Sequence, residues 1–546
     1  MVIAPAAAPS GHPPRCAPFR MDWMLVGLLA AAAFLLFFHL GQRPFWQDEA
    51  ETGCLARSVL RTGLPYAVNG PNIVSQEEGR EFNVDDGCLW RWSPWVQIYA
   101  QAAGFALGGF ATAAGRAPFA LAALLAVFWT YLLIRRHFGD RSWALLAASL
   151  LTLSVPFLLV GRQARYYAVG TLLILWILDA FFRDWRTKWR PWLAALLCLI
   201  FLFHANYLLF LSFVPTALLA ALLVYPDRVL NKRTALLAVA AVLGVLPGVL
   251  LYRVGRQSGM FNILLVPENL MLYFADLCMF LLPLPVAAVL VWRWRRFFTR
   301  LVRPEDPGER FVLFCALLIL FSLLLLGLVP QRFFRYIAHL VPLCAIILGF
   351  CVRRLWGFSR TSGVLLFSLL ALTNWLNVIP MECLGIVNRP WKNDFRMLDY
   401  PNFPIKLFLT ELCCGYPDVN AAIVGFFAAN AKPGQTVLAE YGDMPLQFYL
   451  PDLRVIGGLQ GEIAAREKPD WLLIRRAVRI NRDHVLFGSR AFTESLDLSR
   501  EYERVPVDLP DETFGNRTDD PNHHHFVPVG PPQKPLEIWR RKEAAS

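Results

Sequence analysis

The chain has 546 residues, of which 56% are hydrophobic and 17% are charged, and its formal net charge is +12. A soluble protein of this length does not carry so much apolar surface, so the composition excludes an ordinary soluble enzyme. The basic residues lie in short loops between apolar runs and do not form one stripe, so the charge indicates membrane topology and not a nucleic-acid partner.

Repeated apolar runs approach the length of about 20 residues that crosses a bilayer. In chain order, we expect about eleven spanning helices, near residues 22–40, 117–134, 142–160, 166–182, 190–203, 205–224, 234–252, 270–291, 311–329, 336–352 and 361–379. The first run follows Arg15 and Arg20, as in a signal peptide. It is too long for one and lacks a small-residue cleavage site, so we interpret it as a retained helix.

The stretch 94–110 is apolar but short, and it contains Gln97 and Gln101. If it crossed the membrane, every later helix would be inverted. One set of alternate loops is rich in arginine, near residues 135–141, 183–190, 228–233, 293–310 and 353–360. The opposite loops hold only Arg162, Arg165, Arg253, Arg256, Arg332 and Arg335. Cytoplasmic loops carry the basic excess, so we predict an interfacial helix at 94–110, a cytoplasmic N-terminus and an external C-terminus.

The region after residue 380 contains no spanning run. Short strand-like runs lie at 436–441, 453–456, 471–474 and 536–539, and a helical stretch lies at 418–431. The predicted fold class is therefore an α-helical polytopic membrane protein with a C-terminal α/β domain. We expect a membrane domain over residues 1–380, with a first external loop over about 41–116, and an external domain over residues 381–546.

The cysteines are scattered, without a CxxC pair. Cys54 and Cys88 share the first external loop, so a disulfide between them is one hypothesis and two thiols are the alternative. Three adjacent histidines, His523 to His525, favour a solvated loop over a metal site, because neighbouring side chains cannot all face one ion. We therefore predict no metal site.

Three carboxylates, Asp48, Glu49 and Glu51, follow the first apolar run. Acidic residues suit the first turn of a helix, so a purely structural role is one reading. Arginines and tyrosines are expected at the same membrane surface, namely Arg162, Arg165, Tyr166, Arg332, Arg335 and Tyr336. A basic residue near the membrane core costs roughly 2.5 to 3.5 kcal/mol and usually has a partner. The partner is either one of these carboxylates or a lipid phosphate, which guanidinium groups bind well.

Several segments carry a resemblance to a known group of enzymes. They are QDEA at 47–50, the long stretch 115–172 that begins GRAPFALAALL, and PQRFFRYIAHLVPL at 330–343. Together with the order of apolar runs, they resemble the C-type glycosyltransferase superfamily, in particular the protein O-mannosyltransferases and the lipid A aminoarabinose transferases. The resemblance covers residues 20 to about 380, and the C-terminal domain resembles more loosely the external domain of the aminoarabinose transferases.

The resemblance implies a polyprenyl-phosphate sugar donor and a lipid, glycan or protein acceptor at the periplasmic face of a bacterial inner membrane. It implies Asp48 as catalytic base, with Glu49 as second choice, and the arginines and tyrosines named above as the site for the donor phosphate. One inverting displacement is expected, without an organic cofactor, and a metal requirement stays open. The aminoarabinose transferases have an acidic residue where this chain reads Arg165-Tyr166-Tyr167, which leaves the donor sugar open.

Three other functions fit parts of the pattern. A transporter or lipid flippase would use the same arginines for an anionic substrate, although repeat symmetry and broken central helices are not evident in the sequence. An oligosaccharide polymerase or ligase shares the donor type, and a non-catalytic subunit would share the fold. No P-loop, GxGxxG or HExxH motif occurs, which argues against a nucleotide-driven pump, a dehydrogenase and a metalloprotease.

Overall fold

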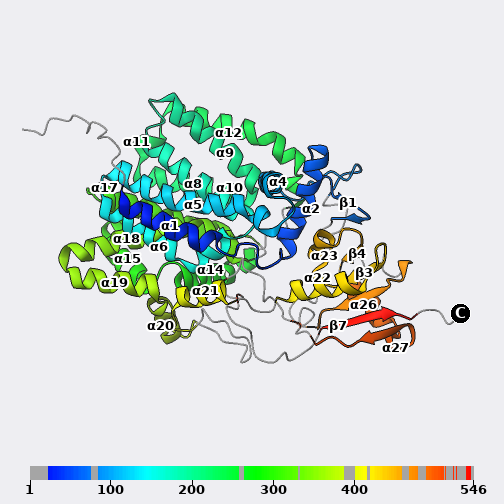
Figure 1. Cartoon of the computed structure of the whole chain (residues 1–546). Helices are drawn as coiled ribbons and strands as arrows, with labels where there is room; N and C mark the ends of the chain where they lie inside the picture. Colours follow the sequence, from blue (N-terminus) through cyan, green and yellow to red (C-terminus); the bar gives the residue numbers. More distant parts are fainter. Residues whose placement is uncertain are drawn as a thin grey trace, which may run out of the picture.

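The structure is a computed structural model and describes residues 22–74, 84–257, 263–329, 332–386, 400–414, 418–457, 466–476, 487–508, 511, 521, 524 and 536–542. A bundle of helices makes up most of the molecule, and a smaller domain built on a mixed sheet lies at one end of it (Figure 1). The predicted first external loop lies between the two parts, and it carries the candidate carboxylates.

The helices of the bundle follow the apolar runs of the sequence. They are α1 (Trp23–Phe37), α5 (Thr112–Phe138), α6 (Arg141–Leu153), α7 (Val155–Gly161), α8 (Tyr166–Phe182), α9 (Trp189–Ala205), α10 (Tyr207–Val224), α12 (Lys232–Leu251), α14 (Val266–Phe280), α15 (Leu284–Arg293), α17 (Pro307–Leu326), α18 (Val341–Phe358), α19 (Arg360–Leu372) and α20 (Trp375–Cys383). Short elements in the loops are α11 (Pro226–Val229), α13 (Val254–Gln257), α16 (Arg295–Arg300) and the 3-10 turns η1 (Ile263–Leu265), η2 (Phe334–Tyr336) and η3 (Ala338–Leu340).

The lengths of these helices confirm a multi-span membrane protein. Among the described residues, six helices are long and apolar enough to cross a bilayer, and up to eight spans result if each of two bent pairs counts as one. The shorter apolar helices α1, α8 and α9 lie at three further expected spans. A total of about eleven spans therefore stays a prediction.

Three expected spans are interrupted. The α6–α7 pair bends by 67° and the α19–α20 pair by 81°. The expected span 270–291 is divided between α14 and α15, which begins directly after Pro283. Proline lacks an N–H and starts a helix more readily than it continues one. The prediction of one continuous helix over 270–291 is wrong for this reason.

The apolar stretch before the second span forms α4 (Val96–Gly108). Its 13 residues extend about 20 Å, less than the roughly 30 Å of a hydrocarbon core. The helix packs on α5 and on α2 (Gln47–Thr62) of the first external loop. Gly104 permits this contact, because a Cβ atom added there would lie 2.2 Å from the carbonyl oxygen of Ala114. The length fits the interfacial helix predicted from the loop charges.

The smaller domain contains a five-stranded sheet in the order β4-β3-β5-β7-β6. Its strands are β3 (Thr436–Ala439), β4 (Arg454–Gly457), β5 (Trp471–Ile474), β6 (Tyr502–Val505) and β7 (Glu537–Arg541). Strand β3 pairs in parallel with β4 and β5, whereas β7 pairs antiparallel with β5 and β6. Its helices are α22 (Val419–Asn430), α23 (Asp443–Tyr449), α26 (Phe487–Ser495) and α27 (Leu498–Glu501). The predicted mixed domain is confirmed, and β6 is a strand that the sequence pattern did not indicate.

Side chains of the first external loop hold this domain in place. Its short strands β1 (Val68–Asn69) and β2 (Asn72–Ile73) form an antiparallel pair. The Asn72 amide donates to the Leu453 carbonyl at 2.8 Å and accepts from the Val455 N–H at 2.7 Å. Arg57 of α2 donates to the Phe448 carbonyl at 2.6 Å. Helix α2 thus lies between the bundle and α23 (Figure 1).

The helix α21 (Pro404–Cys413) lies beyond residue 380 but packs against α7 and α19. The part of the chain after the last membrane helix therefore returns to the bundle before it enters the sheet domain. Of the two hypotheses for Cys54 and Cys88, the structure has the two thiols and not the disulfide. Cys54 is buried in α2, and its Sγ accepts from the Asn69 amide at 3.4 Å.

Candidate active site

The carboxylates of the first external loop lie in the first turn of α2. Trp46 precedes the helix in an extended conformation, and its N–H donates to Glu49 Oε2 at 3.3 Å. Asp48 and Glu49 occupy positions where the positive end of the helix dipole favours negative charge. Gly63, with a φ of 82°, ends the helix in the left-handed region. These local signals fix both carboxylates relative to the bundle.

Asp48 lies between two arginines that are far apart in the sequence. Its Oδ2 is 2.9 Å from Arg335 Nη1, on η2, and 3.4 Å from Arg165 Nη2, which precedes α8. Asp48 and Arg335 are partly accessible, with exposed side-chain fractions of 17% and 16%, whereas Arg165 is buried. Both ion pairs use Oδ2. Oδ1 is therefore the oxygen on which a proton can be accepted without breaking either contact.

Further polar contacts hold Arg165 in this place. Its Nη1 donates to the Asp48 carbonyl at 3.1 Å and to Thr52 Oγ1 at 3.0 Å. Thr52 Oγ1 in turn donates to the Asp48 carbonyl at 2.9 Å. Glu51 Oε1 lies 3.9 Å from the same guanidinium. Contacts with α2 therefore fix the orientation of the Arg165 guanidinium.

The two predicted tyrosines lie close to these arginines. Tyr166 is buried at the start of α8, and its N–H donates to Gln97 Oε1 of α4 at 3.2 Å. Tyr336 belongs to η2, together with Arg335, and the Arg335 guanidinium lies 5.8 Å from its ring centre. Four elements, α2, α4, α8 and η2, therefore bring Asp48, Arg165, Tyr166, Arg335 and Tyr336 together.

Glu49 is bound on all sides. It is 0% exposed, and its two oxygens accept from Arg116 of α5 at 2.9 and 2.5 Å. The Ala164 N–H, in the turn between α7 and α8, donates to the same carboxylate at 2.7 Å. Arg116 also donates to three carbonyls in the segment that leads into α2, those of Leu40, Arg43 and Pro44. This pair joins three segments of the chain and leaves no oxygen accessible to a substrate.

Arg162 lies apart from Asp48. Its Nη1 donates to the Leu35 and Leu36 carbonyls at 2.9 and 3.0 Å and so closes the last turn of α1. It also lines a cavity of about 60 Å³ that includes Arg43 and Glu411. A cation at a helix C-terminus stabilises that end. Arg162 therefore has a local structural role.

Arg332 has a different partner again. Its Nη1 donates to Asp276 Oδ2 of α14 at 2.7 Å, and its side chain is 30% exposed. Tyr273 interacts electrostatically with both Arg332 and Tyr336. Arg332 therefore lies beside the Asp48 cluster without contacting the carboxylate. Of the predicted phosphate-binding arginines, the structure brings Arg165 and Arg335 to Asp48.

Residues outside the predicted set complete the site. Thr52, Gln97 and Arg116 fix Arg165, Tyr166 and Glu49 respectively. Only Gln97 gave a signal in the sequence, as a glutamine within an apolar helix. A further, partly buried contact joins the sheet domain to the start of α2, where Gln47 Nε2 donates to Asp443 Oδ1 at 2.6 Å. Burial raises the pKa of Asp443 to about 6.

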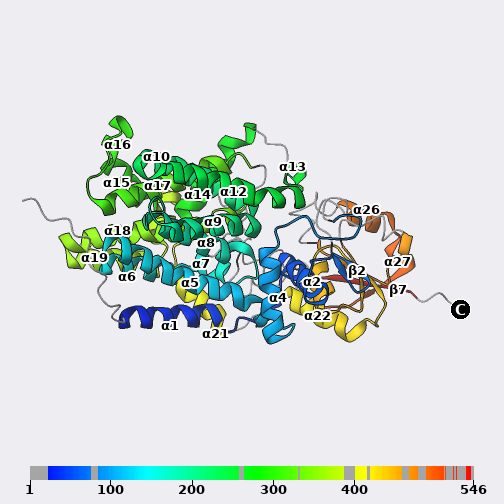
Figure 2. The same cartoon turned by 90° about the horizontal axis from the view of Figure 1, so that it is seen from above.

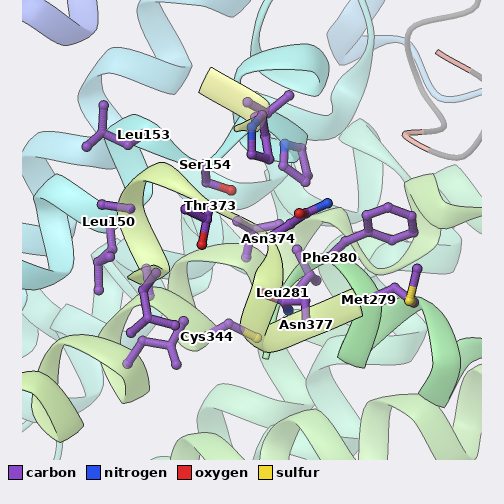
Figure 3. Close-up of a pocket in the computed structure, with 18 residues that line it drawn as sticks. Leu150, Leu153, Ser154, Met279, Phe280, Leu281, Cys344, Thr373, Asn374 and Asn377 are labelled. Carbon is purple, nitrogen blue, oxygen red and sulfur yellow. The ribbon is translucent and has the colours of Figure 1, made fainter. Parts of the chain in front are cut away.

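A cavity of about 80 Å³ lies elsewhere, where the bent pairs α6–α7 and α19–α20 meet (Figure 3). Its walls are mainly apolar, with polar groups from Ser154, Thr373, Asn374 and Asn377. Both asparagine amides make intramolecular hydrogen bonds. Asn377 donates to the Cys278 carbonyl, and Asn374 donates to the Tyr400 carbonyl. None of the predicted site residues lines this cavity, so the Asp48 cluster stays the candidate site.

Comparisons with known proteins give a family match and a similar fold. Residues 93–252 match the family described as dolichyl-phosphate-mannose-protein mannosyltransferase. The fold is similar to that of ArnT from Cupriavidus metallidurans in the apo state, with a TM-score of 0.55 and 13% identity over 84% of this chain and 94% of that chain. The same protein bound to undecaprenyl phosphate gives a TM-score of 0.53 at 13% identity, over the same shares of both chains. No curated protein sequence matches the chain.

A weaker similarity links the chain to the Archaeoglobus fulgidus oligosaccharyltransferase tethered to an acceptor peptide, with a TM-score of 0.46 and 12% identity over 86% of this chain and 72% of that chain. The family match over residues 93–252 and the shared fold bear out the predicted resemblance to C-type glycosyltransferases.

Proposed function

We propose that this chain transfers a sugar from a polyprenyl-phosphate donor to a hydroxyl of a lipid, glycan or protein acceptor at the external face of the membrane. The observation that carries the proposal is the position of Asp48 against Arg165 and Arg335. A base and two phosphate-binding cations at one partly accessible point suit the displacement of a sugar from a lipid phosphate. The family match and the undecaprenyl phosphate bound by ArnT support this donor class.

In the proposed reaction, the acceptor oxygen forms a bond to the anomeric carbon as the bond from that carbon to the phosphate oxygen breaks. The bonding electrons leave with the phosphate, and the proton of the acceptor hydroxyl passes to Asp48 Oδ1. Arg165 and Arg335 stabilise the charge that develops on the phosphate. A phosphate leaving group needs no strong general acid, so one displacement with inversion is sufficient. Glu49 takes no part, because it is buried and saturated by Arg116 and Ala164.

The base is tested by Asp48→Asn, which keeps the size and hydrogen bonding of the side chain but cannot accept the proton. Turnover should fall by roughly 10² to 10⁴, with thermal stability and undecaprenyl phosphate binding close to wild type. The assay follows transfer from undecaprenyl-phosphate-linked sugars by purified protein in detergent, with envelope lipids and glycans from cells with and without the gene used to identify the sugar. The exposed Asp86→Asn in the same loop is the matched control. Near-normal turnover of Asp48→Asn would contradict the proposal.

The phosphate site is tested by comparing two arginines that sequence position alone does not distinguish. Arg335→Ala should weaken undecaprenyl phosphate binding by roughly tenfold or more, because a charge-assisted contact is lost. Arg162→Ala should leave this affinity unchanged and should lower the melting temperature, since it removes the closure of α1. Equal loss of affinity in both variants would show that phosphate binding depends on overall charge and not on this site.

A further inference from the structure

A second concentration of arginines lies at the end of the bundle away from the sheet domain. A cavity of about 810 Å³ opens there between the ends of α5, α8 and α10, the short helix α11 and the start of α17. Figure 1 shows α11 and α17 together at this end, with the sheet at the other. Four arginines line it, namely Arg186, Arg228, Arg303 and Arg310. This cavity shares no residue with the Asp48 cluster.

Backbone carbonyls fix the positions of these arginines. Arg303 Nε donates to the Leu223 carbonyl at 2.7 Å, and Arg310 Nε donates to the Pro304 carbonyl at 3.1 Å. Arg228 Nη1 donates to the Phe181 and Phe182 carbonyls at 3.1 and 3.4 Å. A guanidinium has five N–H donors, and the contacts described for Arg303 and Arg310 use one in each. The remaining donors are available to a ligand in a fixed arrangement.

The charge of the cavity is not balanced by its own walls. Asp227 is the one carboxylate among the lining residues. Asp184 pairs with Arg186 at 2.6 Å, whereas Asp179 is occupied by Arg136, Arg183 and His137. Burial, together with the neighbouring Arg186, lowers the pKa of Arg228. Like charges held together in this way favour an anionic ligand.

The rest of the lining is apolar and aromatic. Phe138, Phe182, Val224 and Tyr225 lie at the ends of helices whose remaining length is apolar, and Leu301 follows the short helix α16. A site with a basic floor, apolar walls and a position at the membrane surface fits a molecule that has a phosphate head and acyl chains. A small soluble anion would bind the arginines but would make no contact with these apolar side chains.

We propose that this cavity binds the phosphate of an anionic phospholipid at the membrane face opposite the Asp48 site. The phosphate lies between Arg303 and Arg310, near Arg228, and the acyl chains pass along the apolar ends of α8 and α10. The site is independent of the transfer reaction, because it lies at the other end of the bundle. Inorganic phosphate is the alternative source of the same chemistry.

The test uses delipidated full-length protein in a neutral detergent. Short-chain phosphatidylglycerol, short-chain phosphatidylcholine and inorganic phosphate are titrated separately while the melting temperature is measured. Phosphatidylglycerol should raise the melting temperature, and phosphatidylcholine, whose head is neutral overall, should not. A rise with inorganic phosphate equal to that with phosphatidylglycerol would support the phosphate site and identify a soluble anion as its ligand.

The variant that decides the matter is Arg303→Gln with Arg310→Gln. This double variant should need about tenfold more phosphatidylglycerol than wild type for the same rise in melting temperature. The matched control is Arg296→Gln with Arg300→Gln, which removes the same charge from the exposed helix α16 and should respond as wild type. Arg303→Gln alone serves if the double variant does not fold, because Arg303 is exposed. The proposal is overturned if wild type shows no rise, or if the cavity variant and the control respond alike.

Discussion

Asp48 and Glu49 are neighbours in one helical turn, yet their surroundings give them opposite properties. Glu49 is fully buried and accepts hydrogen bonds from Arg116, Ala164 and Trp46. Asp48 is partly accessible and uses one oxygen for both of its arginines. A buried and saturated carboxylate stabilises a fold, whereas a partly accessible one can meet a substrate. The difference in accessibility depends on the direction in which each side chain points from α2.

Glu49→Gln is therefore expected to destabilise the protein. The replacement keeps the shape of the side chain but leaves the Arg116 guanidinium buried without a counter-charge, which costs about 3 to 5 kcal/mol. A thermal melt in detergent should show a clear fall in melting temperature, with little change for Asp48→Asn. If Glu49→Gln melts as wild type and loses sugar transfer, the base is Glu49 and the assignment to Asp48 is wrong.

Sequence reasoning reached part of this residue-level arrangement. The positions of Asp48, Arg165 and Arg335 at one membrane surface follow from the topology, because all three lie in loops on the same side. The separate role of Arg162 does not follow, since it is only three residues before Arg165 and its direction depends on where α1 ends. The pairing of Glu49 with Arg116 was likewise not predictable, because it joins residues 67 positions apart.

Asp443 provides a pH-dependent prediction in the external domain. Its folded-state pKa is raised to about 6 by burial, against an ordinary value of about 3.9. The protonated form of Asp443 therefore stabilises the folded state. This contribution to the free energy of unfolding is fully present below the ordinary pKa and is lost as the pH rises through about 6. Asp443→Asn should keep the contact with Gln47 and remove this dependence.

The measurement for Asp443 is a pair of melting curves at pH 5 and pH 8 for each protein. The stability of Asp443→Asn relative to wild type should rise by about 1 to 2 kcal/mol between these values. Comparison of the two proteins removes the contribution of every other titrating group. A difference that is the same at both pH values would mean that Asp443 does not titrate in this range.

At the scale of elements, the crossing of α4 and α5 supports the site through Gln97. Gly104→Ala would place a Cβ 2.2 Å from the Ala114 carbonyl oxygen, and a backbone atom cannot move aside cheaply. We expect a loss of about 1 to 3 kcal/mol, with α4 displaced and the contact from Gln97 to Tyr166 weakened. Donor binding should fall together with melting temperature.

The matched control for this crossing is Gly27→Ala in α1, where an added Cβ meets nothing within 4 Å. Alanine favours a helix over glycine by about 0.5 to 1 kcal/mol, so this variant should be as stable as wild type or more stable. If Gly104→Ala also behaves in this way, α4 does not lie as close to α5 as the structure indicates.

The sequence predicted where helices form better than it predicted where they are interrupted. Apolar length indicated the runs that became α5, α10, α12, α17 and α18. Pro283 and Pro285 were visible within the expected span 270–291, and the missing N–H groups explain why it is divided. The bend between α19 and α20 contains no proline. Asn374 at this bend hydrogen-bonds to Tyr400 and Asn402, which a local pattern does not predict.

At the scale of the whole molecule, the sheet domain contacts the candidate site through α2. The side chains of Arg57, Asn69 and Asn72 donate to backbone carbonyls of the sheet domain, and Tyr449 Oη accepts from the Phe45 N–H at 2.9 Å. Gly53 of α2 packs against the Phe448 ring, where an added Cβ would lie 2.8 Å from a ring carbon. The helix that carries Asp48 is thus held by the bundle on one side and by the sheet domain on the other.

The orientation of the molecule in the membrane is the last prediction. Figure 2 shows α16 and α19 at one end of the bundle and the sheet strands at the other. The loops rich in arginine gather at the first end, which the positive-inside rule places in the cytoplasm. The prediction takes α4, which extends only about 20 Å, as an interfacial helix that does not add a crossing. A phosphatase reporter fused after Ser546 should be active outside the membrane, and one inserted near Arg296 should be silent.

Cytoplasmic activity reporters at the same two positions should give the opposite pattern and exclude poor expression. If the first reporter is silent and the second active, the sheet domain is cytoplasmic and the proposed external acceptor cannot reach Asp48.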